Sequence, residues 1–294
     1  MTTKIATPLS RTTVLVSVRI SQWTARKLDK QITDETNRRY AAKKDAGRYN
    51  KLLIEAERLA EMSSLVSQAR HLHYSMTRPW ADEGARILPN ALYSKFTDDF
   101  RVLKRKFQEA ADRFCAEYPK FIEERKVSLN GAFKATDYPD PSEIRNKFRL
   151  ELAVLPFPDA DDFRSDLDDD VVADIKREIT EQSDKVIDDA MKHTFTQITD
   201  LVGHMASKLK EYKTNKPGER KFFMDSLVDN VRDLVELLPA FNLTNDPKLT
   251  AITKRMAKEL CTEDAQALRD NDDAREAVAK SADEIVAAVG KFLA

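Results

Sequence analysis

The residues best suited to chemistry in this sequence are seven aspartates within the twelve positions DADDFRSDLDDD, residues 159–170. A calcium-binding loop of that length has glycine at its sixth position and glutamate at its twelfth. Here these positions hold Arg164 and Asp170, and a third ligand position holds Phe163. We therefore expect no metal. The segment instead reads as a solvated loop whose last aspartates, Asp168 to Asp170, cap the following helix and complement its dipole.

The other groups that support familiar reactions are absent or badly spaced. His71 and His73 lie two residues apart on a predicted helix, so they point in different directions and cannot share a metal ion. Cys115 and Cys261 lie far apart in helical patterns, which predicts neither a disulfide nor a structural zinc site. The sequence contains no HExxH, GxGxxG, GxxxxGK[ST] or GxSxG motif. We expect a protein that is not an enzyme, with no catalytic residues and no cofactor.

Basic residues form the second candidate surface. Four of them follow one another on a predicted helix: Arg101, Lys104, Arg105 and Lys106. Such a stripe could contact phosphate groups. Acidic residues such as Asp98, Asp99 and Glu109 are interleaved with it, a pattern typical of an exposed, salt-bridged helix. With 49 basic against 50 acidic residues, no overall positive field attracts nucleic acid. A nucleic-acid surface therefore stays open as the alternative.

The composition favours long helices as the elements that position these side chains. Among 294 residues, 34% are charged and only 6 are glycine, which excludes a glycine-rich dinucleotide-binding fold. The apolar run VLVSVRI near the N-terminus is short and is interrupted by Ser17 and Arg19, so it predicts neither a membrane span nor a signal peptide. We expect a mainly α protein in the cytoplasm, without a membrane.

Helical periodicity predicts a hairpin in the first half. Residues 21–44 predict a short amphipathic helix through Trp23, Leu28 and Ile32 that becomes very polar, and residues 47–75 predict a longer one. Helix 91–118 carries apolar residues spaced alternately by four and three: Phe96, Phe100, Leu103, Phe107, Ala110 and Phe114. This heptad-like seam predicts antiparallel, coiled-coil-like packing against helix 47–75. We expect Pro119 to kink or end the helix.

The second half predicts a very long helix near residues 170–212, a turn at TNKPGER, and an antiparallel return from Phe223. The division expected from these patterns has two parts. Residues 1–165 form a helical hairpin with a small β element, and residues 166–294 form a long-helix bundle. A single continuous elongated domain is the alternative.

Two segments carry strand patterns. Residues 13–20 and residues 148–155 each alternate apolar and polar side chains, and prolines bracket the second segment. Because a lone strand cannot satisfy its backbone, we expect the two to pair into a small two-stranded element. The side chains expected to hold it are Val16, Val18, Phe148, Leu150, Leu152 and Val154.

The stretches VSVRISQW, ILPNALYSKF and YPDPSEIRNKFRLELAVLPFPDADDF together resemble a domain-of-unknown-function family of bacteriophages, plasmids and related mobile elements. The resemblance covers roughly residues 12–215. Members of that family are often encoded beside MoxR-type AAA ATPases and von Willebrand factor A-type proteins. The resemblance therefore implies an accessory or adaptor role, and it carries over no catalytic residue.

Two functional hypotheses follow. The first is a non-enzymatic helical adaptor of a phage or mobile element, which presents its surfaces to a partner such as an AAA ATPase or to copies of itself. The alternative is a nucleic-acid-binding protein of phage replication or recombination. An inhibitor of a host defence or host enzyme is a third reading, which the sequence does not separate from the first.

Overall fold

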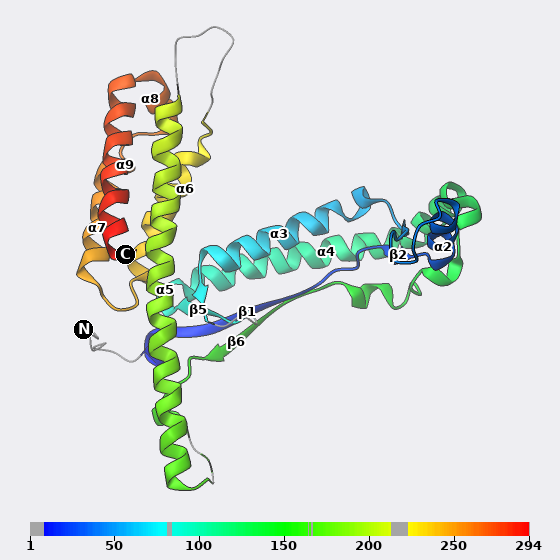
Figure 1. Ribbon diagram of the computed structural model, residues 1–294, viewed down its shortest axis with the longest axis horizontal. Coiled ribbons are helices and arrows are strands. Elements are labelled where there is room, and N and C mark those ends of the chain that lie inside the picture. The colour runs from blue at the N-terminus through cyan, green and yellow to red at the C-terminus, as the bar shows by residue number, and fades with distance from the viewer. Residues whose placement is uncertain (1–8, 81–83, 164, 166, 213–222, 294) are drawn as a thin grey trace. The chain divides into compact units, whose positions relative to one another are not determined.

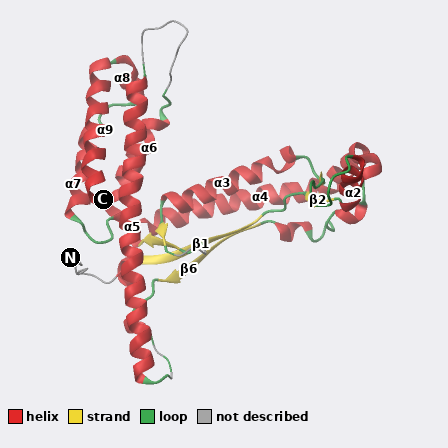
Figure 2. Ribbon diagram, in the orientation of Figure 1, coloured by secondary structure: helices red, strands yellow, loops and turns green. Residues whose placement is uncertain are grey.

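The computed structural model describes residues 9–80, 84–163, 165, 167–212 and 223–293. The chain is 70% helical, and nine α-helices lie within the described ranges. Figure 2 shows how helices dominate the structure, with strands confined to two small sheets. The predicted mainly α fold is confirmed.

Two compact units share the chain. Unit 1 comprises Met1–Val16, Met76–Ser94 and Val154–Ala294, and unit 2 comprises Ser17–Ser75 and Lys95–Ala153. Each unit is thus assembled from separate stretches of sequence, and each has its own hydrophobic core. The division expected at residue 165 stays a prediction.

The predicted helical hairpin forms the body of unit 2. It consists of α3 (Ala60–Ser75), preceded by the short helix η1 (Ala56–Leu59), and of α4 (Asn90–Leu129). Ion pairs link Arg58 to Glu124 and Glu61 to Arg113, so α3 and α4 run antiparallel (Figure 1). Four phenylalanines of the predicted seam are buried: Phe96, Phe100, Phe107 and Phe114. Coiled-coil packing between the two helices stays a prediction.

Helix α4 continues past Pro119, the residue at which we expected a kink or the end of the helix. Pro119 lies inside the helix, which continues to Leu129. Burial of Tyr118 and Phe121 on both sides of Pro119 extends the apolar stripe past it. This packing offsets the hydrogen bond that a proline removes from a helix, so the expected helix end at Pro119 is wrong.

The two helices predicted at residues 21–44 and 47–75 both begin later than expected, and the first also ends earlier, at Arg39. Helix α2 (Lys30–Arg39) starts after Asp29, whose carboxylate accepts a hydrogen bond from the Ile32 amide. The residues before it form β2 (Arg26–Leu28), which pairs antiparallel with β3 (Asn50–Leu52). Long-range strand pairing overrides local helical spacing here, so the residues between β1 and α2 are not helical.

Strands β1 (Thr13–Ser21) and β6 (Arg149–Pro156) are neighbours, as predicted. The Ser21 hydroxyl donates to the Lys147 carbonyl just before β6. The expected two-stranded element is nevertheless too small, because the sheet has four strands in the order β4-β5-β1-β6. The added strands are β4 (Arg78–Pro79) and β5 (Arg86–Pro89), which are too short to show a period in the sequence.

The side chains expected to hold the strand pair are buried to different degrees. Val16, Phe148 and Leu150 are buried, and Val18 and Leu152 are half-buried. Phe148 directly precedes β6. Val154 is 42% exposed, contrary to the expectation, because β6 is an edge strand of the sheet and its last residues face solvent.

Long helices build the core of unit 1. They are α5 (Asp169–Glu211), α6 (Ser226–Phe241), α7 (Pro247–Leu260), α8 (Ala265–Asp270) and α9 (Asp272–Leu293), with a single turn α1 (Leu9–Thr12) before β1. The predicted long helix is α5, and α6 packs on it as expected. Helix α9 covers α5 more extensively, with Phe195 against Phe292 and Lys210 paired with Asp283 (Figure 1). The predicted TNKPGER turn lies outside the described residues.

Candidate functional site

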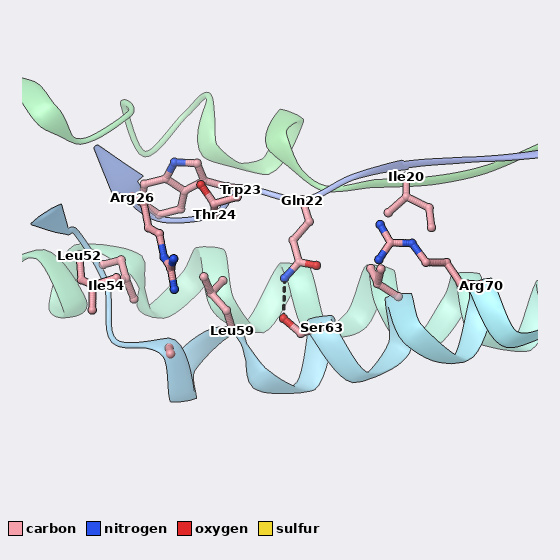
Figure 3. A pocket seen from close by; sticks show the side chains of 12 residues that line it. Ile20, Gln22, Trp23, Thr24, Arg26, Leu52, Ile54, Leu59, Ser63 and Arg70 are labelled. Carbon is pink, nitrogen blue, oxygen red and sulfur yellow. Dashed lines mark hydrogen bonds between the residues drawn. The ribbon is translucent and has the colours of Figure 1, made fainter. Parts of the chain in front are cut away.

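Unit 2 contains an open cavity of about 500 Å³, which we call the trough. It lies between the extended segment 20–26 and the helical segment formed by η1 and α3 (Figure 3). Its size falls within the range of ligand-binding pockets.

The first wall of the trough is the extended segment. Every second residue faces the cavity, namely Ile20, Gln22, Thr24 and Arg26, and Trp23 also lines it. Such alternation is the normal period of an extended chain. Ala25 is buried and has φ +52°, a conformation that alanine adopts at a cost, and its carbonyl accepts the Leu53 amide. Strained backbone of this kind is concentrated at functional sites.

The second wall is one face of the helical segment. Ala56, Leu59, Ser63, Val66 and Arg70 line it, spaced alternately by three and four residues. These residues therefore share one helical face. At 1.5 Å per residue the face is about 21 Å long, so the trough is elongated.

The floor of the trough is apolar and firmly packed. Ile54, Leu59 and Val66 belong to the buried core of unit 2. The indole ring of Trp23 makes edge contacts with Tyr118 and Phe114 of α4, with centroids 5.7 and 6.4 Å apart. Since these contacts fix the ring, the apolar surface exists before any ligand arrives.

Two arginines mark the ends of the trough. Figure 3 shows Arg26 near Ile54 and Leu59 at one end and Arg70 near Ile20 at the other. Between them the Gln22 side-chain amide donates to the Ser63 hydroxyl across the trough, at 2.8 Å. Within the described part of the chain, neither guanidinium has an ion pair or a side-chain hydrogen bond.

The trough has no negative charge in its lining. Asp and Glu supply 50 of the 294 residues, yet none lines this cavity. Two acids that neighbour it in sequence are engaged elsewhere, because Glu55 lies 4.0 Å from Arg125 and Glu61 lies 2.6 Å from Arg113, both on α4. The trough therefore combines an apolar floor with two free cationic ends, and this combination suits an anionic ligand with an apolar body.

The lining supplies binding groups rather than reactive ones. Its polar members are two guanidinium groups, one amide and the hydroxyls of Thr24 and Ser63. A hydroxyl becomes a nucleophile only beside a base, and no His, Lys, Cys, Asp or Glu lines the trough.

The predicted basic stripe lies on α4 and is not part of the trough. Arg101 pairs with Asp98 at 2.7 Å, and Arg105 lies 3.9 Å from Glu109, as the interleaved acids indicated. Lys104 is half-buried and Lys106 is exposed. The role of these residues in nucleic-acid binding stays a prediction.

In the acidic segment 159–170, the first aspartate accepts two hydrogen bonds. Asp159 accepts from the Ser10 hydroxyl at 2.6 Å and from the Asp161 amide, and the bond from Ser10 is the main reason why its pKa is lowered. Asp168 occupies the N-cap position of α5 but makes no side-chain capping bond, contrary to the expectation. Asp169 and Asp170 lie in the first turn of α5, where a negative charge complements the helix dipole. Among the described residues, no cluster of His, Cys, Asp or Glu could hold a metal ion.

Lys51 carries a buried charge, and the sequence did not predict that this lysine is buried. Its ammonium group lies 2.9 Å from Asp29, 2.6 Å from Asp137 and 2.7 Å from the Ala132 carbonyl. These three partners use all three of its N–H groups. Burial by itself lowers the pKa of Lys51, but the two carboxylates outweigh that effect and raise it. The ammonium group therefore has no free hydrogen-bond donor, and it links β3 to Ala132 and Asp137 in the segment before β6.

Arg78 plays the same structural part in unit 1. It is fully buried, donates to Thr194 at 2.8 Å and to Gln197 at 2.9 Å, and stacks 3.3 Å from the centre of the Phe241 ring. Burial, together with the nearby charge of Arg86, lowers the pKa of Arg78 to about 9. The guanidinium ties β4 to α5 and α6.

The trough was missed in the sequence because segment 22–28 has helical spacing. Two signals were present nonetheless: the alternation from Ile20 to Arg26, and the repeat from Ala56 to Arg70. Only the pairing of β2 with β3 brings the two segments face to face.

Comparisons with known proteins find no matching family model, no similar curated protein and no similar solved structure. None of the helices in the described ranges has an apolar stretch long enough to span a membrane.

Proposed function

We propose that the protein is a non-enzymatic interaction protein that binds a segment of a partner protein in the trough. The observation that carries this proposal is the elongated apolar trough with an unpaired arginine at each end. Its lining can recognise shape and charge but holds no group that accepts a proton at neutral pH.

The resemblance to a phage and plasmid family supports an adaptor role in the cytoplasm of the host cell. It points to a MoxR-type AAA ATPase as the partner, and a second copy of the same chain is the other partner that we consider. The ATPase as partner rests on that resemblance, and self-association rests on the long amphipathic helices.

Copurification from the cells in which the gene is expressed tests this function. The tagged wild-type chain should retain a partner protein that the double variant Arg26→Glu/Arg70→Glu loses. Arg19→Glu is the matched control, because Arg19 is exposed on β1 of unit 2 but does not line the trough. An identical set of partners for all three proteins would overturn the proposal.

A further inference from the structure

We propose that the trough recognises an extended acidic peptide segment, with a carboxylate at each end of about six residues and apolar side chains between them. This inference rests on the proposed function and specifies the chemistry of the partner segment. Three features of the trough carry it: its length, the separation of its charges and the pattern of its floor.

The length of the trough favours an extended chain. An extended peptide advances about 3.3 Å per residue, so about six residues span the 21 Å face. The wall formed by residues 20–26 is itself extended, and it presents every second side chain to the cavity. A peptide lying alongside would likewise direct every second side chain toward the floor.

The separation of the charges decides where the acids lie. Arg26 and Arg70 stand at opposite ends, and the only polar groups that bridge the middle are Gln22 and Ser63. A guanidinium binds a carboxylate through two parallel hydrogen bonds. An acid at each end of the segment would therefore satisfy both arginines, while an acid in the middle would meet no cation, only Gln22 and Ser63, which already bond to each other.

The same charge pattern argues against a nucleic acid in the trough. Single-stranded nucleic acid carries a phosphate at every nucleotide and needs a cationic groove that follows its backbone. The trough has two cations with an apolar floor between them. Trp23 is held by edge contacts with Phe114 and Tyr118 of α4.

Trp23 also provides the readout for a binding experiment. The chain has two tryptophans, and Trp80 belongs to unit 1. In a full-length Trp80→Phe protein the emission of Trp23 reports on the trough alone. The probe is a seven-residue peptide, Glu-Thr-Val-Thr-Leu-Thr-Glu, acetylated and amidated at its ends, which places both glutamates and both apolar side chains on one face. We expect a dissociation constant on the order of 10 to 100 µM, as befits a short segment.

Charge reversal tests the two arginines directly. The peptide should bind about tenfold more weakly to Arg26→Glu and to Arg70→Glu, and unchanged to the control Arg19→Glu. The double variant should instead bind the peptide whose two glutamates are replaced by lysine. Such a rescue cannot come from a misfolded protein. It supports the proposal even if the single variants are less stable.

Three results would overturn the inference: no binding of the acidic peptide to the wild-type trough, equal binding to the double variant, or tighter binding of oligothymidylate or decanoate. Failure of the peptide while a cellular partner still depends on Arg26 and Arg70 would refute the ligand class and leave the interaction function intact. Binding of the peptide without any arginine-dependent cellular partner would refute the function and leave the recognition chemistry intact.

Discussion

At the residue scale, this protein uses buried charges to fix structure and exposed charges to offer a surface. Lys51 and Arg78 are completely surrounded, and each is hydrogen-bonded to its neighbours. Arg26 and Arg70 are exposed and have no partner within the described chain. The same residue types therefore have opposite roles, and the difference lies in what the fold places around them.

The Lys51 cluster should make unit 2 sensitive to acid. Hydrogen bonds from Lys51 and the Ile32 amide lower the pKa of Asp29 below its ordinary 3.8. Burial raises the pKa of Asp137, but hydrogen bonds from Lys51 and Lys27 outweigh it and the pKa falls. A carboxyl whose pKa is lowered by folding stabilises the fold above its unfolded pKa, and that stability is lost as the pH falls through the folded pKa.

The variant Lys51→Met tests this cluster. Removing one partner of a buried ion pair should cost about 3 kcal/mol at pH 7, because Asp29 keeps only the cation Lys134, at 3.9 Å, and Asp137 keeps only the half-exposed Lys27. Thermal unfolding at pH 7 and below pH 4 measures both effects. The wild type should lose stability as the pH falls below 4. The variant should lose less, since protonation relieves carboxylates that have lost their main partner. An equal loss in both proteins would contradict the role given to Lys51.

At the element scale, the side chains of β6 become more exposed along the strand. On one face of the strand, Leu150 is buried, Leu152 is half-buried and Val154 is exposed. The acidic segment that follows is exposed at Asp161 and Asp162. The strand therefore contributes stability mainly through its first half.

Glutamate placed along β6 should reveal this gradient. We expect Leu150→Glu to destabilise by about 3 kcal/mol, because it buries a charge in the core of unit 2. Leu152→Glu should cost less, and Val154→Glu at most about 0.5 kcal/mol. Neutralising Asp161 and Asp162 together is the matched control and should change stability little. Urea unfolding of the purified variants gives the order. Equal losses at Leu150 and Val154 would contradict the gradient of burial along β6.

At the scale of the whole molecule, the two hydrophobic cores share no residue. Trp80 packs against the core of unit 1 and contacts Phe157, while Trp23 packs against the core of unit 2. Each unit thus has its own fluorescent reporter.

Single-tryptophan proteins should therefore report separate unfolding events. We expect Phe107→Leu, a change in the core of unit 2, to lower the unfolding temperature seen by Trp23 by several degrees and to leave that seen by Trp80 nearly unchanged. Met205→Ala in unit 1 should do the reverse. The two reporters are isolated with Trp80→Phe and Trp23→Phe. Identical shifts at both reporters for either variant would show that the units unfold as one.

The sequence by itself determined the local features of this protein. The heptad-like seam from Phe96 to Phe114, the long helix α5 and the pairing of β1 with β6 all follow from periods of apolar residues. Periodicity succeeds there because burial of one face is what stabilises those elements.

The trough, the short strands and the burial of Lys51 and Arg78 were decided by the tertiary structure alone. Residues 22–28 have helical spacing but form no helix, because the pairing of β2 with β3 and the Lys51 ion pairs outweigh a weak local preference. The walls of the trough come from segments about forty residues apart, and although each wall has a period of its own, nothing in the sequence indicates that the two face each other. Whether an arginine is buried as a tie, like Arg78, or free to bind, like Arg70, depends on neighbours that only folding supplies.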